Sequence, residues 1–386
     1  MLRIAAFVLS LLVVGSATAQ VNVVAPPSRP NRLVKLARQI EPDLVGKSER
    51  LPQYVESFRS QLANDTRLFA FDVTAAETQP GKVSLEGYVE FPQTRSGLVG
   101  FLEVLGFEVT DDQLETLPSA SLVDKAFGLV KASHTLSYDQ PDEPREVVTD
   151  CLLGEPLFLL RKEGDHYLAH SGEGYLGYVS AADVERVNAK SFADYPSTSA
   201  VRMTTNHTLD DGMVLPMGAL LKKLPSDEGT TRVALPGGAT ADIPSNVCQP
   251  ANSAPDEVEK AIAVGKQLLG TPYHWGGKTS AGIDCSGLVQ VSYAATGLHL
   301  PRDSNQQFLS GQLVATRWNR DGLRRGDTLY FLGEYGRIRH TAIYLGDDRF
   351  MHAVMPRATI NSFNPEHAEY DAKRAANFAF GKRLLQ

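Results

Sequence analysis

The stretch Ile283-Asp284-Cys285-Ser286-Gly287-Leu288-Val289 decides how the rest of the chain is interpreted, because it places a cysteine where a helix begins. After Cys285, apolar side chains recur at three- and four-residue spacing as far as Gly297, which indicates a helix with one packed face. The backbone N–H groups and the dipole at a helix start favour a thiolate and suit an oxyanion. Cys285 is therefore a candidate nucleophile. The competing interpretation is a buried cysteine that serves as a small apolar side chain.

Two histidines follow in strand-like segments. His340 lies in the run 339–346 and His352 in the run 350–353, with a turn predicted at Gly346-Asp347-Asp348. If the hairpin loop has an odd number of residues and Gly346 takes a positive φ, His340 lies directly opposite His352, with Cβ atoms roughly 5 Å apart. Such a pair suits nucleophilic catalysis, because one imidazole takes the thiol proton while the second group fixes its tautomer.

Several short motifs in a fixed order resemble the NlpC-type cell-wall cysteine peptidases, over residues 256 to 386. The motifs are Thr271-Pro272-Tyr273-His274-Trp275-Gly276-Gly277, Asp284-Cys285-Ser286-Gly287, Pro301-Arg302-Asp303-Ser304, Leu323-Arg324-Arg325-Gly326-Asp327, and then His340 and His352. The resemblance implies a papain-like fold and cleavage of peptidoglycan stem peptides between γ-linked D-glutamate and a diamino acid. It implies Cys285 as the nucleophile, His340 as the general base and His352 as the orienting residue.

The same resemblance implies roles for residues around the thiol. Tyr273 matches the tyrosine that the family places beside the nucleophile, and Asp284, Ser286 and Ser304 match positions that line the substrate groove. From the residues alone, Tyr273 either donates its phenolic O–H to the oxyanion or packs beneath the helix. Asp284 caps the helix, receives a substrate ammonium, or does both. We expect Trp275 to fix a turn and not to bind ligand.

The first 19 residues have the pattern of a secretory signal peptide. Arg3 precedes an apolar run from Ile4 to Gly15, and Ala17-Thr18-Ala19 forms a small-residue cleavage site before Gln20. The run is too short for a transmembrane helix. We therefore expect an exported protein, periplasmic or associated with the cell wall, without an integral membrane segment after signal removal.

Composition narrows the remaining possibilities. The chain has 386 residues, three cysteines and a formal net charge of -7. The charge argues against a basic nucleic-acid-binding face, and three cysteines exclude a disulfide-rich scaffold. In an oxidising compartment Cys151 and Cys248 have the option of pairing, which leaves Cys285 as the odd thiol. We expect a monomer that needs no metal and no organic cofactor.

Composition shifts divide the region before the catalytic domain. Residues 20–130 predict a small α+β module of unknown role. Short strand-like segments over 131–188 predict a small β-barrel that resembles bacterial SH3-like domains. The segment 189–250 shows a weaker pattern of the same kind, which predicts a second SH3-like domain. In relatives with such a barrel, an acidic residue and a tyrosine help to close the cleft and meet the free amine of the stem peptide. Glu146 and Tyr175 are the candidates in this chain.

The sequence therefore predicts an α+β protein in which SH3-like barrels and an N-terminal module precede a papain-like domain at 256–386. Its expected activity is hydrolysis of stem peptides, or of their released fragments, through a Cys285 thioester. If Asp284 and the barrel residues bind a substrate ammonium, acetylation of that amine lowers activity. Two alternatives stay open: a non-catalytic wall-binding protein, and an amidase or acyltransferase on the same fold. Intact Cys285, His340 and His352 argue against the first, whereas the second shares the thioester chemistry.

Overall fold

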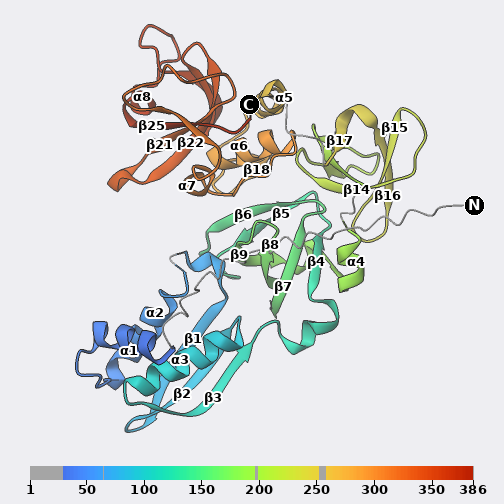
Figure 1. The fold of residues 1–386 in the computed structure, drawn as a ribbon. Coiled ribbons are helices and arrows are strands. Elements are labelled where there is room, and N and C mark those ends of the chain that lie inside the picture. Colours follow the sequence, from blue (N-terminus) through green and yellow to red (C-terminus); the bar gives the residue numbers. More distant parts are fainter. Residues whose placement is uncertain (1–28, 64, 196–198, 252–257, 386) are drawn as a thin grey trace, which may run out of the picture.

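The computed structural model describes residues 29–63, 65–195, 199–251 and 258–385, so the predicted signal peptide at 1–19 lies outside the described part. Four units follow one another along the chain (Figure 1). Helices and sheets occur together in the first and last units, which confirms the α+β class. Within the described ranges, no helix has the length and apolar character needed to cross a membrane.

The first unit packs helices against a three-stranded sheet (Figure 1). Its elements are α1 (Arg29–Ile40), α2 (Leu51–Arg59), β1 (Phe71–Gln79), β2 (Lys82–Val89), α3 (Pro92–Val104) and β3 (Glu108–Thr116). β1 and β2 form the expected antiparallel hairpin, whereas β3 runs parallel to β2 because α3 carries the chain back across the sheet. The core includes Leu85, Leu98 and Phe101, which are fully buried.

The second unit is a seven-stranded sheet with the strand order β10-β4-β7-β8-β9-β5-β6. Its strands are β4 (Phe127–Val130), β5 (His134–Tyr138), β6 (Val147–Leu152), β7 (Pro156–Glu163), β8 (His166–Ser171), β9 (Leu176–Ser180) and β10 (Val184–Val187). We expected residues up to 130 to belong to the N-terminal module, but β4 pairs with β7 and β10. The boundary lies earlier because Val130 packs in the core of this sheet with Leu157 and Leu159.

The third unit is a five-stranded sheet in the order β16-β15-β14-β11-β17. Its strands are β11 (Ala200–Met203), β14 (Leu220–Leu224), β15 (Thr230–Ala234), β16 (Thr240–Pro244) and β17 (Cys248–Pro250). A short helix, α4 (Ala189–Ala193), precedes it, and a small hairpin pairs β12 (His207–Thr208) with β13 (Val214–Leu215). Cys151 in β6 and Cys248 in β17 are free thiols in different sheets, so the disulfide that the sequence left open is absent.

The fourth unit packs helices against a six-stranded sheet in the order β20-β25-β21-β22-β23-β24. The strands are β20 (Gln312–Thr316), β21 (Thr328–Leu332), β22 (Ile338–Gly346), β23 (Arg349–Val354), β24 (Arg357–Ser362) and β25 (Phe378–Arg383). The helices are α5 (Val258–Gln267), α6 (Cys285–Ala294), α7 (Ser304–Gln307) and α8 (Ala372–Asn377). Leu288 and Val289 of α6 pack on Ile343 and Met351 of the sheet, so the helix lies directly against β22 and β23.

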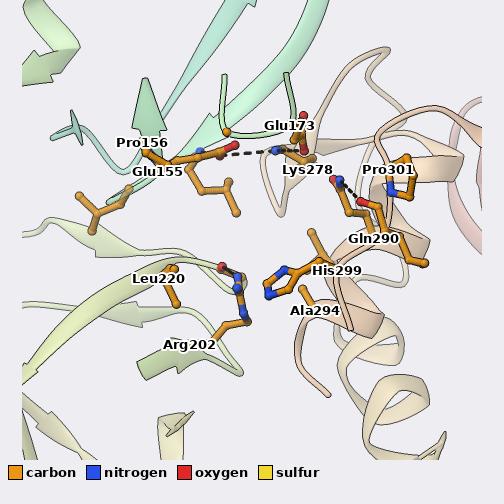
Figure 2. Close-up of a pocket in the computed structure, with 16 residues that line it drawn as sticks. Glu155, Pro156, Glu173, Arg202, Leu220, Lys278, Gln290, Ala294, His299 and Pro301 are labelled. Carbon is orange, nitrogen blue, oxygen red and sulfur yellow. Dashed lines mark hydrogen bonds and ion pairs between the residues drawn. The ribbon is translucent and has the colours of Figure 1, made fainter. Parts of the chain in front are cut away.

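A buried ion cluster joins the second unit to the fourth. Lys278 Nζ lies 2.7 Å from Glu173 Oε1 and 3.5 Å from Glu155 Oε2. Figure 2 shows this cluster beside a pocket of about 500 Å³, with Arg202 of the third unit and His299 of the fourth unit lying close together on another side of the pocket. Because a buried charge is costly without its partner, the cluster favours one arrangement of these units.

Candidate active site

Asp284 determines where α6 begins. Its Oδ1 accepts a hydrogen bond from the Gly287 N–H at 2.7 Å, so Asp284 is the N-cap and Cys285 is the first residue of the helix. The thiol is buried, with Cys285 only 6% exposed. The backbone N–H groups of Ser286 and of Thr341, on the neighbouring strand β22, both interact with it. The helix start predicted from the sequence is confirmed.

The ionisation of Cys285 differs from the expectation. Burial raises the pKa of the Cys285 thiol to about 12, and the negative charge of Asp284 acts in the same direction. The Thr341 N–H, the Arg302 charge and the Ser286 N–H lower this pKa but do not outweigh burial. The Ser286 N–H at the helix start thus favours the thiolate as the sequence predicts, but desolvation exceeds this effect in the resting site. Cys285 keeps its proton at neutral pH.

His340 and His352 contact each other on adjacent strands. Their rings meet edge to face with centroids 5.0 Å apart, and His340 Nε2 lies 2.8 Å from His352 Nδ1. The two do not lie directly opposite, because Ile343 pairs with Met351 and so places His352 two residues from the position facing His340. An irregularity beside Gly346, whose φ is +87° as expected, shifts the register. Both side chains nevertheless lie on one face.

Asn361 on β24 extends this pair into a chain of three side chains. His352 Nε2 lies 2.8 Å from Asn361 Oδ1, and Asn361 Nδ2 donates to the Glu369 carbonyl at 3.0 Å. Since the amide oxygen only accepts, His352 carries its proton on Nε2, and its Nδ1 accepts the N–H of His340 Nε2. His340 Nδ1 then has a lone pair. Sequence reasoning missed Asn361. The available signal was that Asn361 is a polar residue within the strand-like run 358–361.

Both imidazoles are neutral at neutral pH. Burial lowers the pKa of His340 well below its ordinary 6.5, and the neighbouring His352 lowers it further. Burial also lowers the pKa of His352 to about 4, although the hydrogen bond to Asn361 acts in the opposite direction. A neutral imidazole with a free lone pair is the form that a general base requires.

Tyr273 and Arg374 lie near the thiol. Burial, and next the electrostatic effect of the neighbouring Cys285, raise the pKa of the Tyr273 phenol, so this hydroxyl keeps its proton and can donate. Arg374 on α8 interacts electrostatically with both Cys285 and Tyr273, and its charge favours their anionic forms. Sequence reasoning missed Arg374, because no motif marked α8.

Asp284 is occupied by partners on both carboxylate oxygens. Arg302 Nη2 donates to Oδ2 at 2.7 Å and Nη1 donates to Oδ1 at 3.0 Å. Ser286 Oγ donates to Oδ1 at 3.1 Å and accepts from Arg302 Nη1 at 2.8 Å. The sequence predicted that Asp284 caps the helix, binds a substrate ammonium, or does both, and the structure shows the helix cap. A substrate ammonium would have to share this carboxylate with the buried Arg302.

Comparison with known proteins agrees with this geometry. Residues 270–376 match the sequence model of the NlpC/P60 family. The chain carries an NlpC/P60 domain. By class it is a cysteine peptidase. Cys285, His340, His352 and Asn361 all fall inside the matched segment.

Relatives extend the likeness beyond the NlpC/P60 domain. The chain is 29% identical over 232 residues to a protein of Bacillus cereus named gamma-D-glutamyl-L-lysine dipeptidyl-peptidase, covering 54% of this chain and 67% of that one. It is 33% identical over 142 residues to peptidoglycan endopeptidase RipA of Mycobacterium tuberculosis, covering 33% of this chain and 27% of that one. A crystal structure of an NlpC/P60 family protein from Bacillus cereus shares the fold, with a TM-score of 0.57 and 23% identity over 67% of this chain and 100% of that one.

The cleft of the NlpC/P60 domain brings most of the predicted site residues together. Asp284, Cys285, Ser286, Ser304 and Glu146 line one cavity of about 1110 Å³. His340 and Tyr273 line an adjoining cavity beside Arg374, and His352 is buried behind His340.

Two aromatic residues of the predicted site differ in their access to the cleft. Trp275 lies in a turn, as expected from the sequence, where the Gly277 N–H donates to the His274 carbonyl at 3.1 Å, and its side chain also lines the cleft and is 53% exposed. Tyr175 is almost fully buried, and its hydroxyl donates to Asp303 Oδ2 at 2.8 Å. The cleft also includes Asp65, Thr66 and Arg67 of the N-terminal module, which sequence reasoning did not anticipate.

Proposed function

We propose that this protein hydrolyses peptidoglycan stem peptides at the bond between γ-linked D-glutamate and a diamino acid. Cys285 is the nucleophile, His340 the general base and His352 the residue that orients it. The observation that carries the proposal is the Asn361–His352–His340 chain, because it leaves a lone pair on Nδ1 of a buried, neutral imidazole. The Thr341 N–H, one residue along the same strand, interacts with the Cys285 thiol. The names of the two relatives support the substrate and the bond.

Acylation begins from a neutral thiol and a neutral imidazole. Sγ of Cys285 attacks the γ-carbonyl carbon while His340 Nδ1 takes the thiol proton, because the high pKa of the thiol disfavours a preformed ion pair. The carbonyl oxygen becomes an oxyanion, which the Cys285 N–H at the start of α6 and the Tyr273 hydroxyl stabilise.

Breakdown of the intermediate returns the proton. The imidazolium of His340 protonates the departing amine of the diamino acid as the C–N bond breaks, which leaves the γ-glutamyl group as a thioester on Cys285. His340 then takes a proton from water, whose oxygen attacks the thioester, and the carboxylate product leaves as the thiol re-forms. His352 accepts from His340 Nε2 throughout, which stabilises the imidazolium in this orientation.

Export and domain roles are part of the same proposal. The signal-like segment 1–19 and a wall-derived substrate both fit an exported monomer that begins near Gln20, periplasmic or cell-wall-associated. We assign the SH3-like barrels to the second and third units, within 131–188 and 189–250, and a substrate-facing role to Ser286, Ser304 and Glu146. Stem peptides, or fragments released from the wall, are the expected partners.

The test is product analysis with a defined peptide. The mature protein and its Cys285→Ala variant are incubated with N-acetylated and free L-Ala-γ-D-Glu-diaminopimelate, and products are followed by mass spectrometry. We expect release of diaminopimelate by the wild type and by a Cys151→Ala control, and none by Cys285→Ala. If the wild type cleaves neither peptide, the proposal is wrong, and a wall-binding or acyltransferase role takes its place.

A further inference from the structure

A pocket of about 500 Å³ lies where the second, third and fourth units meet (Figure 2). Each unit contributes to its wall, for example Leu152 of β6, Leu220 of β14 and Val291 of α6. None of the residues that line the cleft around Cys285 lines this pocket. Small ligands often bind in pockets of this size between domains, and the mechanism above assigns no role to this one.

Arg202 on β11 is a buried cation at one side of the pocket. It is 7% exposed, and its Nη1 donates to the Gly218 carbonyl at 2.7 Å. Its Nε has no hydrogen-bond partner, and no carboxylate of the described residues forms an ion pair with the guanidinium. Burial lowers the pKa of Arg202, while the charge of Glu155 acts in the opposite direction. Because a buried cation without an anionic partner is costly, a carboxylate bound here would reduce that cost.

The opposite side of the pocket carries excess negative charge. Glu155 and Glu173 share one ammonium, since Lys278 Nζ lies 2.7 Å from Glu173 Oε1 and 3.5 Å from Glu155 Oε2. Glu155 is the carboxylate that Lys278 holds less closely. Burial raises the pKa of Glu155 although the Lys278 charge lowers it. A second cation beside Glu155 would therefore stabilise its anionic form.

The charges that line the pocket balance in number but are separated in space. Arg202 and Lys278 are the cations, and Glu155 and Glu173 are the carboxylates. Burial, and next the Arg202 charge, lower the pKa of His299, so this imidazole is neutral at neutral pH. Arg202 and His299 lie on one side of the pocket and the Lys278 cluster on the other (Figure 2). A ligand with a single charge would unbalance the pocket, whereas a zwitterion would preserve the balance and complement both sides.

Gln290 of α6 adds an unused hydrogen-bond acceptor. Its Nε2 donates to the Leu300 carbonyl at 2.9 Å, and its Oε1 is buried without a partner. A buried acceptor without a donor destabilises the protein, so an N–H group of a ligand would be favourable here. Much of the remaining wall is apolar and includes Leu153, Pro156, Leu220, Val291 and Ala294.

We propose that this pocket is a second binding site, for a small zwitterion with an apolar body, such as an apolar amino acid or dipeptide. The carboxylate of the ligand accepts from Arg202 Nε, and its ammonium donates to Glu155 and to Gln290 Oε1. Its apolar body packs on the side of α6, the helix that begins at Cys285. The inference is independent of the proposed hydrolase activity, because the pocket shares no residue with the cleft.

Calorimetry with alanyl-alanine tests the site. The L,L and D,D forms are each titrated into the wild-type protein at neutral pH, together with the N-acetylated form, the C-terminal amide and the doubly blocked form. We expect the zwitterion of at least one hand to bind and to raise the unfolding midpoint as its concentration increases. Blocking either end should weaken binding roughly tenfold, because each block removes one charge-assisted contact.

Two charge variants locate the ends of the ligand. Arg202→Gln should weaken binding of the zwitterion roughly tenfold but barely change that of the C-terminal amide, which has no carboxylate. Glu155→Gln should likewise weaken the zwitterion and spare the N-acetylated peptide. Arg232→Gln is the matched control, since it breaks an exposed ion pair with Asp242 in the third unit. It should bind all the peptides as the wild type does.

A third variant fills the pocket without changing its charge, in case Arg202→Gln does not fold. Ala294→Leu places a larger side chain in the wall, so it should abolish binding while the unfolding midpoint stays near that of the wild type. Three results would overturn the inference: no binding of either alanyl-alanine at about 10 mM, equal binding of blocked and unblocked peptides, or unchanged binding in Ala294→Leu. The last result would place the peptide elsewhere on the protein.

Discussion

At the scale of single residues, the site depends on which nitrogen of each histidine carries a proton. Asn361 presents an amide oxygen to His352, and this contact sets the tautomer of His352 and then that of His340. Each ring is neutral because it is buried. Residues that never contact the substrate therefore place the lone pair where the thiol proton has to go.

Removing the amide oxygen tests this chain. In Asn361→Leu, His352 loses its acceptor and is free to adopt the other tautomer, so kcat should fall about 10- to 100-fold while KM changes little. Thr359→Val, two residues away on the same strand, is the control and should retain activity. Steady-state kinetics that show unchanged kcat in Asn361→Leu would contradict the assigned tautomers.

The lowered histidine pKa values predict the acid limit of activity. His340 acts as a base only when neutral, and burial holds its pKa well below 6.5. As pH falls from 8, kcat/KM should therefore stay level through pH 6.5 and decline only at lower pH, as His340 becomes protonated. A pH profile whose acid limb is centred at 7 or above would mean that the base is not the buried His340.

Residue identities around the thiol followed from local sequence, whereas their ionisation did not. Cys285, His340 and the cap at Asp284 stand in short motifs whose spacing is visible in the chain. The thiol pKa depends on burial by β22 and on the Asp284 charge, and these are properties of packing. Asn361 and Arg374 were missed for the same reason, since each reaches the site from a separate element.

At the scale of elements, the start of α6 combines a helix cap with a buried ion pair. Asp284 accepts from the Gly287 N–H and from both terminal nitrogens of Arg302, which is 2% exposed. This arrangement joins the first turn of the helix to the segment that precedes α7. Asp284 therefore stabilises the position of the thiol even though it raises its pKa.

The Asp284→Asn variant isolates the charge of this pair. Asparagine still accepts at the N-cap but leaves the buried Arg302 cation without an anionic partner, so the free energy of unfolding should fall by about 3 kcal/mol or more. Urea denaturation measures this loss. Asp242→Asn, which breaks an ion pair on the exposed surface, should leave the unfolding curve nearly unchanged. Equal curves for Asp284→Asn and wild type would contradict the role of the pair.

Element order could be predicted better than element register. Period-two alternation and turn residues located β22 and β23, and they placed both histidines on one face. The pairing differed by two residues, because an irregularity between Tyr344 and Gly346 is decided by turn geometry that the alternation pattern does not specify. The boundary of the N-terminal module at residue 130 was also placed too late, because β4 belongs to the sheet of its pairing partners, β7 and β10, which the local pattern does not reveal.

At the scale of the whole molecule, the N-terminal module is part of the cleft. Arg67 and Asp303 are far apart in sequence but lie 2.6 Å apart, and the Lys278–Glu173 pair likewise joins two units. Such contacts depend on how units dock, which no local sequence pattern encodes. The main residues of the catalytic domain were therefore predictable, whereas the residues that the other units contribute to its cleft were not.

The central claim is that Cys285 forms a thioester with a γ-glutamyl group, and a burst experiment tests it most directly. L-Ala-γ-D-Glu-p-nitroanilide releases p-nitroaniline on acylation, so a stopped-flow trace reports this step, and acid quench with mass spectrometry locates the acyl group. The account predicts a burst of about one equivalent per wild-type molecule, an acyl group on the Cys285 peptide, and neither in Cys285→Ala. Release of p-nitroaniline by Cys285→Ala at the wild-type rate, or an acyl group on another residue, would contradict it.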